Sequence, residues 1–592
     1  MKDIKTNWDL KLFYKSPKDP QIEKDIRRAE RVCDGFAKKY SKSKTHLRNE
    51  NALLKALKDC EKLIEDPSGS RAVFYFHYLK DLDASDQRAE SMINKLHNRL
   101  TKAGNKILFF DLELGKIDKK LQKKILKSKK LAKYKHHLSV LFERAKHRLS
   151  ELEEKILNLK SLPGYLMWVN GVEKNINKKT VDFEGKKISF AEAGGKIAYL
   201  PTQKRRELFK NMMLKTKEAV EFSESEINAI FTDKKIDDDL RGFEKPYSAA
   251  VLEYENDEKT VLNLVENVEN NFDISHKFGE IKSKILGLKF LEYADKYAVI
   301  GKLKRKFDFA ESVDILREGF GGVGKRYLNI FDSMLKNGQI DAFPKIGKAD
   351  GAYCSSSVKL PTFVLLNHTN DFRSLTTLAH EMGHAIHAEL SKKQPAIYQD
   401  YSISVAETAS TFFEQLIFDK IMEKLTDKEK VIALHDKINN SVGTTFRQVA
   451  CFNFELELHE KVRHDGFVPA EEIAKIMNKH MKSYLGSTVK LTELDGYIFI
   501  RWSHIRQPFY VYTYALGELV SRALYARYKK DKNYVKNIEG ILEAGGSKSP
   551  KDILKDAGIN INSAEFLKDG FENLRKELAE FAGLIKKTNY KI

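Results

Sequence analysis

The segment Leu378–His387 reads LAHEMGHAIH and contains the pattern H-E-x-x-H. On an α-helix, residues four positions apart lie on the same face, with Cβ atoms about 5–6 Å apart. His380 and His384 have this spacing, so their imidazoles can bind one zinc ion at about 2.0–2.1 Å. Glu381 lies one position further around the helix, where a carboxylate can act as general base toward a metal-bound water. The segment therefore predicts a helix that carries a metal site.

The residues around this motif also favour a helix. Asn370 and Asp371 follow a predicted strand and offer an N-cap and an acidic first turn. Apolar residues then recur at helical spacing and predict a buried stripe: Leu375, Leu378, Met382 and Ile386. The two histidines lie on the flank of that stripe. The alternative is a pair of surface histidines on a helix, and a third metal ligand would favour the metal site.

A candidate third ligand, Glu407, lies in the segment Ile403–Glu414, which also has helical character. Glu407, Thr411 and Glu414 share one face of that helix. Small residues beside them would let a second helix approach closely: Ala406, Ala409 and Ser410. Two histidines and one glutamate leave one zinc position open for water or substrate, as in catalytic rather than structural zinc sites. The alternative for Glu407 is a solvated carboxylate on a helix.

The composition indicates a folded, helical chain. The 592 residues are 42% hydrophobic and include 12 Pro and 32 Gly, which excludes disordered and collagen-like chains. The formal net charge of +20 suggests nucleic-acid binding. The basic stretch 119–146 keeps apolar residues at helical spacing, however, and we interpret it as the solvated face of an amphipathic helix. The four cysteines form no C-x-x-C pair, so we expect neither a disulfide framework nor a cysteine-bound zinc.

Targeting signals are not evident in the sequence. The first 20 residues contain no apolar core of a secretory signal. No stretch reaches the roughly 18 consecutive apolar residues of a membrane-spanning helix. We therefore expect a cytoplasmic protein that does not bind a membrane.

The hydrophobic pattern predicts long helices over residues 20–160, with breaks at 66–69 (DPSG) and 163–164 (PG). The pattern then changes. Residues 181–183 and 188–190 flank a Glu-Gly turn and predict a short hairpin.

Helices resume after about residue 200, and the segment 359–367 (KLPTFVLLN) is predicted as a strand. The glycine-rich segment 319–325 (GFGGVGK) has the spacing of a phosphate-binding loop, but Arg326 replaces the required Ser or Thr and a helical pattern precedes it. We interpret it as a turn between helices. The predicted organisation is an N-terminal helical lobe over 1–195 and a catalytic domain over 196–592, without a flexible linker.

Taken together, these segments resemble the oligoendopeptidase F branch of the thimet oligopeptidase family of zinc metallopeptidases. Outside the H-E-x-x-H segment the similarity extends to several stretches: Trp8–Leu10 with Leu12–Phe13 and Asp19–Pro20, Gly347–Lys348 and Gly351–Tyr353 ahead of PTFVLLN, Ala406–Ser410, Pro508–Tyr512, Ala544–Ser547, and Asp556–Gly558. The resemblance implies a mainly α, two-lobed, zincin-like fold around a deep central channel, with a small β-sheet near the active site.

The resemblance also implies roles for individual residues. One Zn²⁺ per chain would be held by His380, His384 and Glu407, with Glu381 as the catalytic general base. Glu407 rather than Glu414 would be the metal ligand. Glu414 would then orient a zinc-bound histidine through its free ring nitrogen.

The family places a tyrosine that stabilises the oxyanion in the segment His504–Tyr514. A phenol can donate a hydrogen bond to the oxyanion without carrying net charge. Tyr510 and Tyr514 are the favoured candidates, with His504 as a further donor. The alternative is that these aromatic residues belong to the core.

Four further features are predicted to contact substrate. The strand over 362–367 would pair with an extended peptide, backbone to backbone. Gly351 and Tyr353 would close over that peptide, and Tyr512 is a further candidate contact. Backbone pairing supplies affinity without selecting side chains, which predicts broad peptide specificity.

We therefore predict a zinc-dependent endopeptidase that hydrolyses internal bonds of short, unstructured oligopeptides by means of a metal-activated water. One alternative is a dipeptidyl carboxypeptidase of the same family. Another is a basic nucleic-acid-binding protein, which charge alone would support. The expected partners are short peptide substrates, without a specific nucleic acid or a membrane, and the sequence predicts no oligomeric state.

Overall fold

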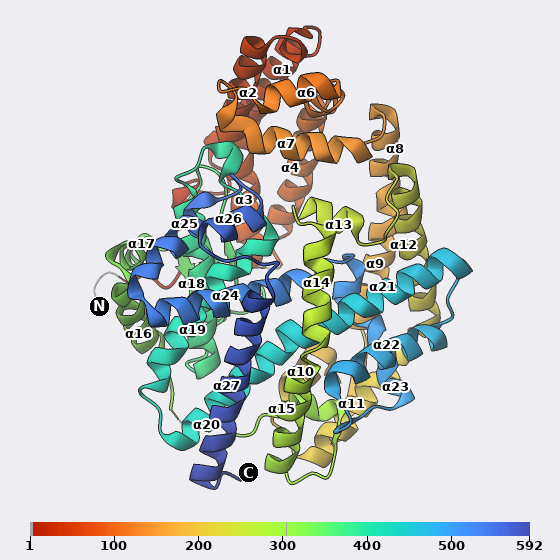
Figure 1. The fold of residues 1–592 in the computed structure, drawn as a ribbon, viewed down its shortest axis with the longest axis vertical. Helices are drawn as coiled ribbons and strands as arrows, with labels where there is room; N and C mark the ends of the chain where they lie inside the picture. The colour runs from red at the N-terminus through yellow and green to blue at the C-terminus, as the bar shows by residue number, and fades with distance from the viewer. Residues whose placement is uncertain (1–3, 84, 304, 592) are drawn as a thin grey trace. The chain divides into compact units, whose positions relative to one another are not determined.

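Helices form most of the chain, as the sequence predicts (Figure 1). The computed structural model describes residues 4–83, 85–303 and 305–591. The chain divides into two compact units, each assembled from three separate segments. Unit 1 contains Met1–Arg148, Lys304–Glu423 and Leu524–Asn560, and unit 2 contains Leu149–Leu303, Lys424–Ala523 and Ile561–Ile592. No boundary between the two units lies at residue 195. The predicted division into an N-terminal helical lobe over 1–195 and a catalytic domain over 196–592 stays a prediction.

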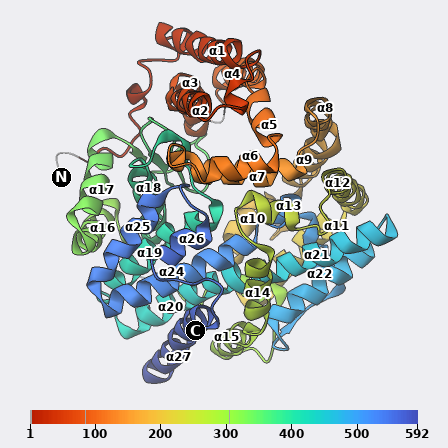
Figure 2. The ribbon, with the colours of Figure 1, turned by 45° about the horizontal axis from the view of Figure 1, so that its top comes forward.

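Unit 1 begins with a bundle in which α1, α3 and α4 lie side by side (Figure 2). The predicted break at 66–69 is present, because α2 ends at Glu65 and α3 begins at Ser68. The helices of unit 1 are α1 Pro20–Tyr40, α2 Glu50–Glu65, α3 Ser68–Leu82, α4 Gln87–Asn105, α5 Phe109–Gly115, α6 Lys119–Leu126, α7 Lys135–Arg144, α16 Phe309–Val323, α17 Lys325–Asn337, α18 Phe372–Ser391, α19 Ile403–Met422, α25 Val535–Ala544 and α26 Pro550–Asp556.

The basic stretch 119–146 differs from the prediction of one amphipathic helix. It forms α6 and α7, joined by an irregular segment and a short 3₁₀ turn at Ala132–Tyr134. The side chains of Leu131 and Tyr134 in this connection are almost fully buried in a hydrophobic cluster. Burial of the connecting residues thus favours a bend where the sequence pattern alone predicts continuity.

The helices of unit 2 include the long pair α21 and α22, which run side by side in Figure 1. Helix α24, Tyr512–Lys530, begins in unit 2, and its residues from Leu524 onward belong to unit 1. The other helices of unit 2 are α8 Glu151–Ser161, α9 Met167–Asn177, α10 Phe190–Ile197, α11 Thr202–Lys217, α12 Val220–Arg241, α13 Ser248–Glu253, α14 Glu258–Glu269, α15 Phe272–Ile285, α20 Asp427–Ser441, α21 Arg447–Asp465, α22 Ala470–Leu485, α23 Glu493–Gly496 and α27 Ala564–Thr588.

One predicted break is wrong and one predicted hairpin is confirmed. The segment at Pro163 does not end the helix, because a π-helical turn at Leu162–Leu166 connects α8 to α9. A wider turn of this kind accommodates a proline that lacks a backbone donor.

Strands β1 Thr180–Phe183 and β2 Lys186–Ser189 pair antiparallel as predicted. Their connecting residues Glu184 and Gly185 both have positive φ, at 50° and 76°, as tight hairpin turns require.

A three-stranded sheet in unit 1 precedes the helix that carries the H-E-x-x-H motif. Its strands are β4 Ile340–Asp341, β5 Tyr353–Ser355 and β6 Phe363–Leu365, in the spatial order β4-β6-β5. Strand β6 confirms the strand predicted over 359–367, and it pairs parallel with β4 and antiparallel with β5. A separate parallel pair in unit 2 consists of β3 Leu291–Glu292 and β7 Val489–Lys490.

The glycine-rich segment is a turn between helices, as expected, because α16 ends at Val323 and α17 begins at Lys325. None of the described helices is both long enough and apolar enough to cross a bilayer.

Candidate metal centre

Helix α18 carries the motif and begins at the predicted position. Asp371 is its N-cap, and the Asp371 carboxylate accepts a hydrogen bond from the backbone N–H of Ser374 at 2.8 Å. The apolar stripe is fully buried, as predicted: Leu375, Leu378, Met382 and Ile386 are each 0% exposed. With this face of α18 buried, the side chains of His380 and His384 remain 28% and 20% exposed on its flank.

Gly383, inside the motif, lets α18 and α19 approach each other closely. A Cβ atom at Gly383 would lie 2.6 Å from the Ser410 Cα and 2.9 Å from the Ala409 carbonyl oxygen. Both contacts are to backbone, so no side-chain rotation relieves them. The small residues Ala409 and Ser410 are almost fully buried on the other side of this crossing. Close packing of the two helices brings Glu407 of α19 to the histidines of α18.

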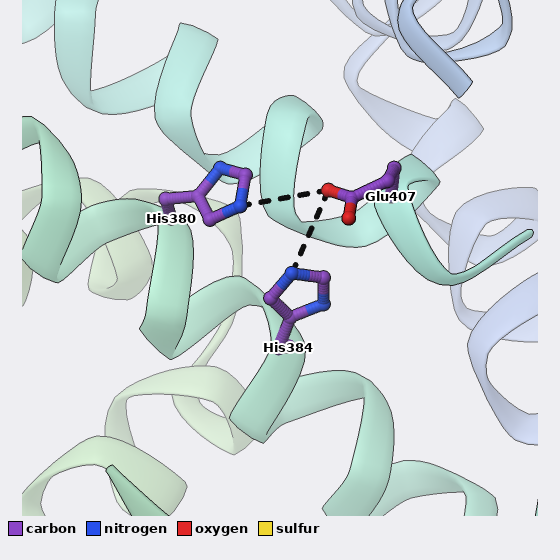
Figure 3. A group of neighbouring side chains, drawn as sticks. All are labelled: His380, His384 and Glu407. Atoms are coloured by element: carbon purple, nitrogen blue, oxygen red, sulfur yellow. Dashed lines mark ion pairs between the residues drawn. The ribbon is translucent and has the colours of Figure 1, made fainter. Parts of the chain in front are cut away.

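The three predicted ligands converge on one point (Figure 3). The Nε2 atoms of His380 and His384 lie 3.5 Å and 3.6 Å from the same Oε2 atom of Glu407. All three ligand atoms lie within 4.8 Å of one another. A tetrahedral ion with bonds of about 2.0–2.2 Å holds neighbouring ligand atoms about 3.3–3.6 Å apart. The nitrogen and oxygen atoms present therefore fit a four-coordinate divalent cation with one position left open.

Charges around the two histidines favour different protonation states of their rings. Burial lowers the pKa of His384 to about 4, which keeps its ring neutral and able to bind a metal. Burial also lowers the pKa of His380, but the hydrogen bond and charge of Glu414 outweigh that effect and raise it to about 9. The Nδ1 atom of His380 lies 3.1 Å from Oε2 of Glu414. This is the contact that the sequence predicted for Glu414.

Glu407 is held by its own helix. Burial raises the pKa of this carboxyl, but its interactions with the rings of His384 and His380 and with the Ser410 hydroxyl outweigh that effect, so the pKa is lowered and the group is ionised. The hydroxyl of Ser410 donates a hydrogen bond of 2.8 Å to the same Oε2 atom that faces the histidines. Ser410 was predicted only as a small residue at the helix crossing, and its contact with Glu407 was missed. Ser410 follows Glu407 by three residues on the same helix, and this spacing could have predicted the contact.

Glu381 lies at the wall of a cavity of about 320 Å³ beside the three ligands. The residue is 7% exposed, and burial raises the pKa of its carboxyl to about 7. Cys354 of strand β5 lines the same cavity as this carboxyl. The cavity is lined by Ala352, Tyr353, Cys354, Ser356, His380, Glu381, His384, Ala388, Tyr401 and Glu407.

Tyr401 in this lining was missed by the sequence prediction. Its ring stacks on the buried imidazole of His387, with 3.6 Å between ring centroids and 8° between ring planes. His387 is the third histidine of LAHEMGHAIH, and Tyr401 lies just before α19. The extra histidine one turn after His384 was the only signal in the sequence for this contact.

The strand predicted to receive substrate is not the one with a free edge. Strand β6 lies in the centre of the sheet and is paired on both sides, so a peptide cannot add to it. Strand β5 lies at the edge, and Cys354 within it lines the cavity. The prediction for 362–367 is therefore wrong, and the edge strand that lines the cavity is Tyr353–Ser355.

The two predicted substrate-loop residues differ in their surroundings. Gly351 is exposed, with φ at 80° and no atom within 4 Å of the place of a Cβ. Tyr353 lines the cavity, but its hydroxyl donates to Asp81 and its ring packs edge-on against Trp8 at 6.3 Å between centroids. The side chain of Tyr353 is thus anchored in the N-terminal bundle. A role in closing over a peptide stays a prediction for both residues.

The predicted oxyanion residues cluster together in unit 2. The Nδ1 atom of His504 and the hydroxyl of Tyr510 form a hydrogen bond, and the rings of Tyr510 and Tyr514 lie 5.7 Å apart. Tyr512 points elsewhere. It is fully buried, and its hydroxyl accepts a hydrogen bond of 2.9 Å from the Asn256 side chain. The structure therefore does not support Tyr512 as a substrate contact, while the roles of the other three residues stay predictions.

Two helices bring two histidines and a carboxylate together beside a buried glutamate. This arrangement is typical of a metallohydrolase of the H-E-x-x-H class. The chain belongs to peptidase family M3, whose profile matches residues 201–573, more than half of the chain. A second profile, described as Oligopeptidase F, matches residues 113–170.

Relatives and solved structures match nearly the whole chain. The chain is 27% identical to oligopeptidase PepF of Bacillus subtilis over 98% of this chain and 87% of that protein. It is also 27% identical to an oligoendopeptidase F homolog of Borreliella burgdorferi over 97% of each chain. A putative peptidase from Chlamydophila abortus has the same fold, with a TM-score of 0.84 at 22% identity and 98% coverage of both chains. The protein is thus a metalloendopeptidase with the predicted mainly α fold.

The contact between Glu414 and His380 provides a test of metal binding. We expect Glu414→Ala to lower metal affinity about 10–100-fold, because the ring of His380 loses the partner of its second nitrogen. The measurement is competition for zinc with a chromophoric chelator. Glu423→Ala is the matched control, because Glu423 lies at the end of the same helix and is exposed. Equal affinities in the two variants would show that Glu414 does not support the metal site.

Proposed function

We propose that His380, His384 and Glu407 bind one Zn²⁺ per chain and that the enzyme hydrolyses internal bonds of short, unstructured oligopeptides. The observation that carries the proposal is the convergence of two imidazole nitrogens and one carboxylate oxygen at the separations of a tetrahedral site. This donor set suits zinc, although cobalt or manganese would also be accepted. The proposal includes the cytoplasmic location predicted from the sequence.

When bound, the zinc ion would act as a Lewis acid and lower the pKa of its water to about 7. Glu381 takes the proton from the attacking water and later delivers it to the leaving amine nitrogen. A carboxyl whose pKa burial raises to about 7 is suited to both transfers near neutral pH. Tyr510, Tyr514 and His504 are proposed as donors to the oxyanion of the substrate.

The edge of strand β5 orients the peptide in this proposal. An extended peptide pairs with the backbone of β5 beside Glu381, so that the scissile carbonyl lies next to the ligands. Backbone pairing needs an unfolded substrate and recognises few side chains. This accounts for a preference for short, unstructured peptides of varied sequence.

The proposed activity is tested by digesting one internally quenched nonapeptide with and without a chelator. We expect mass spectrometry to show cleavage at internal bonds, loss of cleavage after chelation, and recovery when zinc is added back. Release of dipeptides from the C-terminus alone would instead support the dipeptidyl carboxypeptidase alternative. Full cleavage by the metal-free protein would refute the proposed mechanism.

A further inference from the structure

A tyrosine that the sequence prediction missed lines the cavity of the metal centre. Tyr401 shares this cavity with the three candidate ligands and with Glu381, and every residue of the lining belongs to unit 1. The cavity of about 320 Å³ has room for roughly ten water molecules. A peptide bond that is held next to the ligands in so small a space also lies close to the other walls. The side chain of Tyr401 is therefore within reach of a bound substrate.

Of the two phenols in this lining, Tyr401 is the one whose hydroxyl is not engaged. The hydroxyl of Tyr353 donates to Asp81. The backbone N–H of Tyr401 donates to the Asp400 side chain at 3.0 Å, but its hydroxyl has no hydrogen-bond partner among the residues that the structure describes. This oxygen is also not one of the enclosed polar atoms that lack a partner, so water or a ligand in the cavity can reach it. Burial raises the pKa of Tyr401, which keeps the proton on the oxygen and makes the hydroxyl a donor.

The ring of Tyr401 is positioned without the use of its hydroxyl. It stacks on the ring of His387, with 3.6 Å between centroids and 8° between planes. His387 is 0% exposed, and neither of its ring nitrogens has a hydrogen-bond partner in the described part of the chain. A ring in these surroundings serves as a flat support that is itself held by the packing around α18. The stack fixes the plane of Tyr401 and leaves its oxygen for a ligand.

The segment that leads into Tyr401 is fixed by two glycines, Gly545 and Gly546, for which the proposed mechanism has no use. The backbone N–H of Gly546 donates to the carbonyl oxygen of Tyr398 at 2.9 Å. A Cβ atom at Gly545 would lie 2.1 Å from that oxygen, and a Cβ atom at Gly546 would lie 2.5 Å from the carbonyl oxygen of Asp400. Because these contacts are to backbone, a side chain at either glycine would displace the segment. Close backbone packing and the ring stack thus hold Tyr401 from two sides.

We infer that the Tyr401 hydroxyl donates a hydrogen bond to a main-chain carbonyl oxygen of the bound peptide, which makes Tyr401 a substrate-binding residue of the metal centre. The inference rests on the proposed function, because it takes a peptide as the ligand.

The proposed pairing of the peptide with strand β5 leaves such a carbonyl without a donor. A strand that adds to an antiparallel edge exchanges hydrogen bonds at every second residue only, and the carbonyls in between point to the other side. These carbonyls need donors of their own once water is excluded. Cys354 of β5 and Tyr401 line the same cavity, so the unengaged hydroxyl can serve one of them. A neutral phenol satisfies a carbonyl without selecting a side chain, which agrees with a broad peptide specificity.

The first experiment compares Tyr401→Phe with the unmodified zinc enzyme on two internally quenched nonapeptides of unrelated sequence. Phenylalanine keeps the ring and its stack on His387 but removes the donor. We expect kcat/KM to fall about 3–10-fold, the effect of one lost hydrogen bond, and to fall equally for both peptides because the contact is to the main chain. Zinc affinity, measured by competition with a chromophoric chelator, should not change. An unchanged kcat/KM, or a loss confined to one of the two sequences, would overturn the inference.

Tyr398→Phe is the matched control, because it removes a phenol hydroxyl three residues away and outside the cavity lining. Tyr398 is 4% exposed, and its hydroxyl accepts a hydrogen bond of 3.2 Å from the backbone N–H of His137. The control should keep the wild-type kcat/KM for both peptides. If it loses as much as Tyr401→Phe, the effect comes from the segment rather than from the Tyr401 hydroxyl, and the inference fails.

A second pair of variants tests the support of the ring. His387→Phe keeps a flat ring against Tyr401, whereas His387→Leu does not. We expect the first to retain kcat/KM and the second to lose at least as much as Tyr401→Phe, with circular dichroism to confirm that both are folded. Adding Tyr401→Phe to His387→Leu should then cause little further loss, because both changes remove the same contact. Fully additive losses would show that the stack does not position the hydroxyl.

A binding measurement separates this inference from the proposed catalysis. Glu381→Gln protein, with and without the added Tyr401→Phe change, is titrated with an intact nonapeptide by calorimetry. We expect the added change to weaken binding about 3–10-fold. Failure of the wild-type enzyme to cleave any peptide would count against the proposed function alone. Equal binding by the two proteins would count against the Tyr401 contact alone.

Discussion

Replacing Glu381 with glutamine should lower kcat on an internally quenched peptide by about 10²–10⁴-fold while zinc remains bound. Glutamine has nearly the same size as glutamate, but it cannot take a proton from water. Glu381 does not belong to the ligand cluster, so the metal content should stay near one ion per chain. Steady-state kinetics together with metal analysis of the same sample test both statements.

The control for this prediction lies on the same helix. Glu389 accepts hydrogen bonds of 2.5 Å from Thr362 and Lys392, and Glu389→Gln keeps an acceptor there. This variant should retain kcat within about threefold, as for substitutions away from a site. A Glu381→Gln enzyme that cleaves peptide at the wild-type rate would require a different general base.

The second large effect is expected from one methyl group in the motif. Gly383→Ala places a Cβ 2.6 Å from the Ser410 backbone, and overpacking of this kind costs about 1–3 kcal/mol. Because the obstacle is backbone, α19 has to shift, and Glu407 shifts with it. A misplacement of about 1 Å can cost on the order of 10²-fold in rate. We expect a lower melting temperature, weaker zinc binding and a loss of kcat/KM of that order.

An exposed glycine separates this crowding from the effect of alanine itself. Gly35 lies within α1, is exposed, and has no atom within 4 Å of the place of a Cβ. Gly35→Ala should stabilise the protein by up to about 1 kcal/mol, because alanine favours the helix. Its activity should not change. If Gly383→Ala behaves like Gly35→Ala, the close crossing does not position Glu407.

The local features of the metal centre are the ones that sequence reasoning predicted well. The cap at Asp371, the buried stripe of α18 and the small residues of α19 all follow from helical spacing over a few residues. Fold class followed in the same way, from helical periodicity along most of the chain. The hairpin at 180–189 followed from a two-residue turn.

The errors concern features that depend on distant parts of the chain. The strand over 362–367 had the right pattern, but its place in the sheet depends on β4 and β5 on either side. Tyr512 resembled its neighbours Tyr510 and Tyr514, yet Asn256 and the core around it turn it inward. Pro163 predicted a break, and the chain instead continues through a π-helical turn.

The sequence by itself determined the two candidate ligand histidines, the candidate general base and the helix that carries them, because residues three and four apart on a helix share a face whatever surrounds them. The choice of Glu407 over Glu414 came from the family resemblance. Only the tertiary structure decided which strand edge is free beside Glu381. It also decided that Tyr512 is buried against the Asn256 side chain. Both properties depend on contacts between segments far apart in the sequence, and no local pattern specifies them.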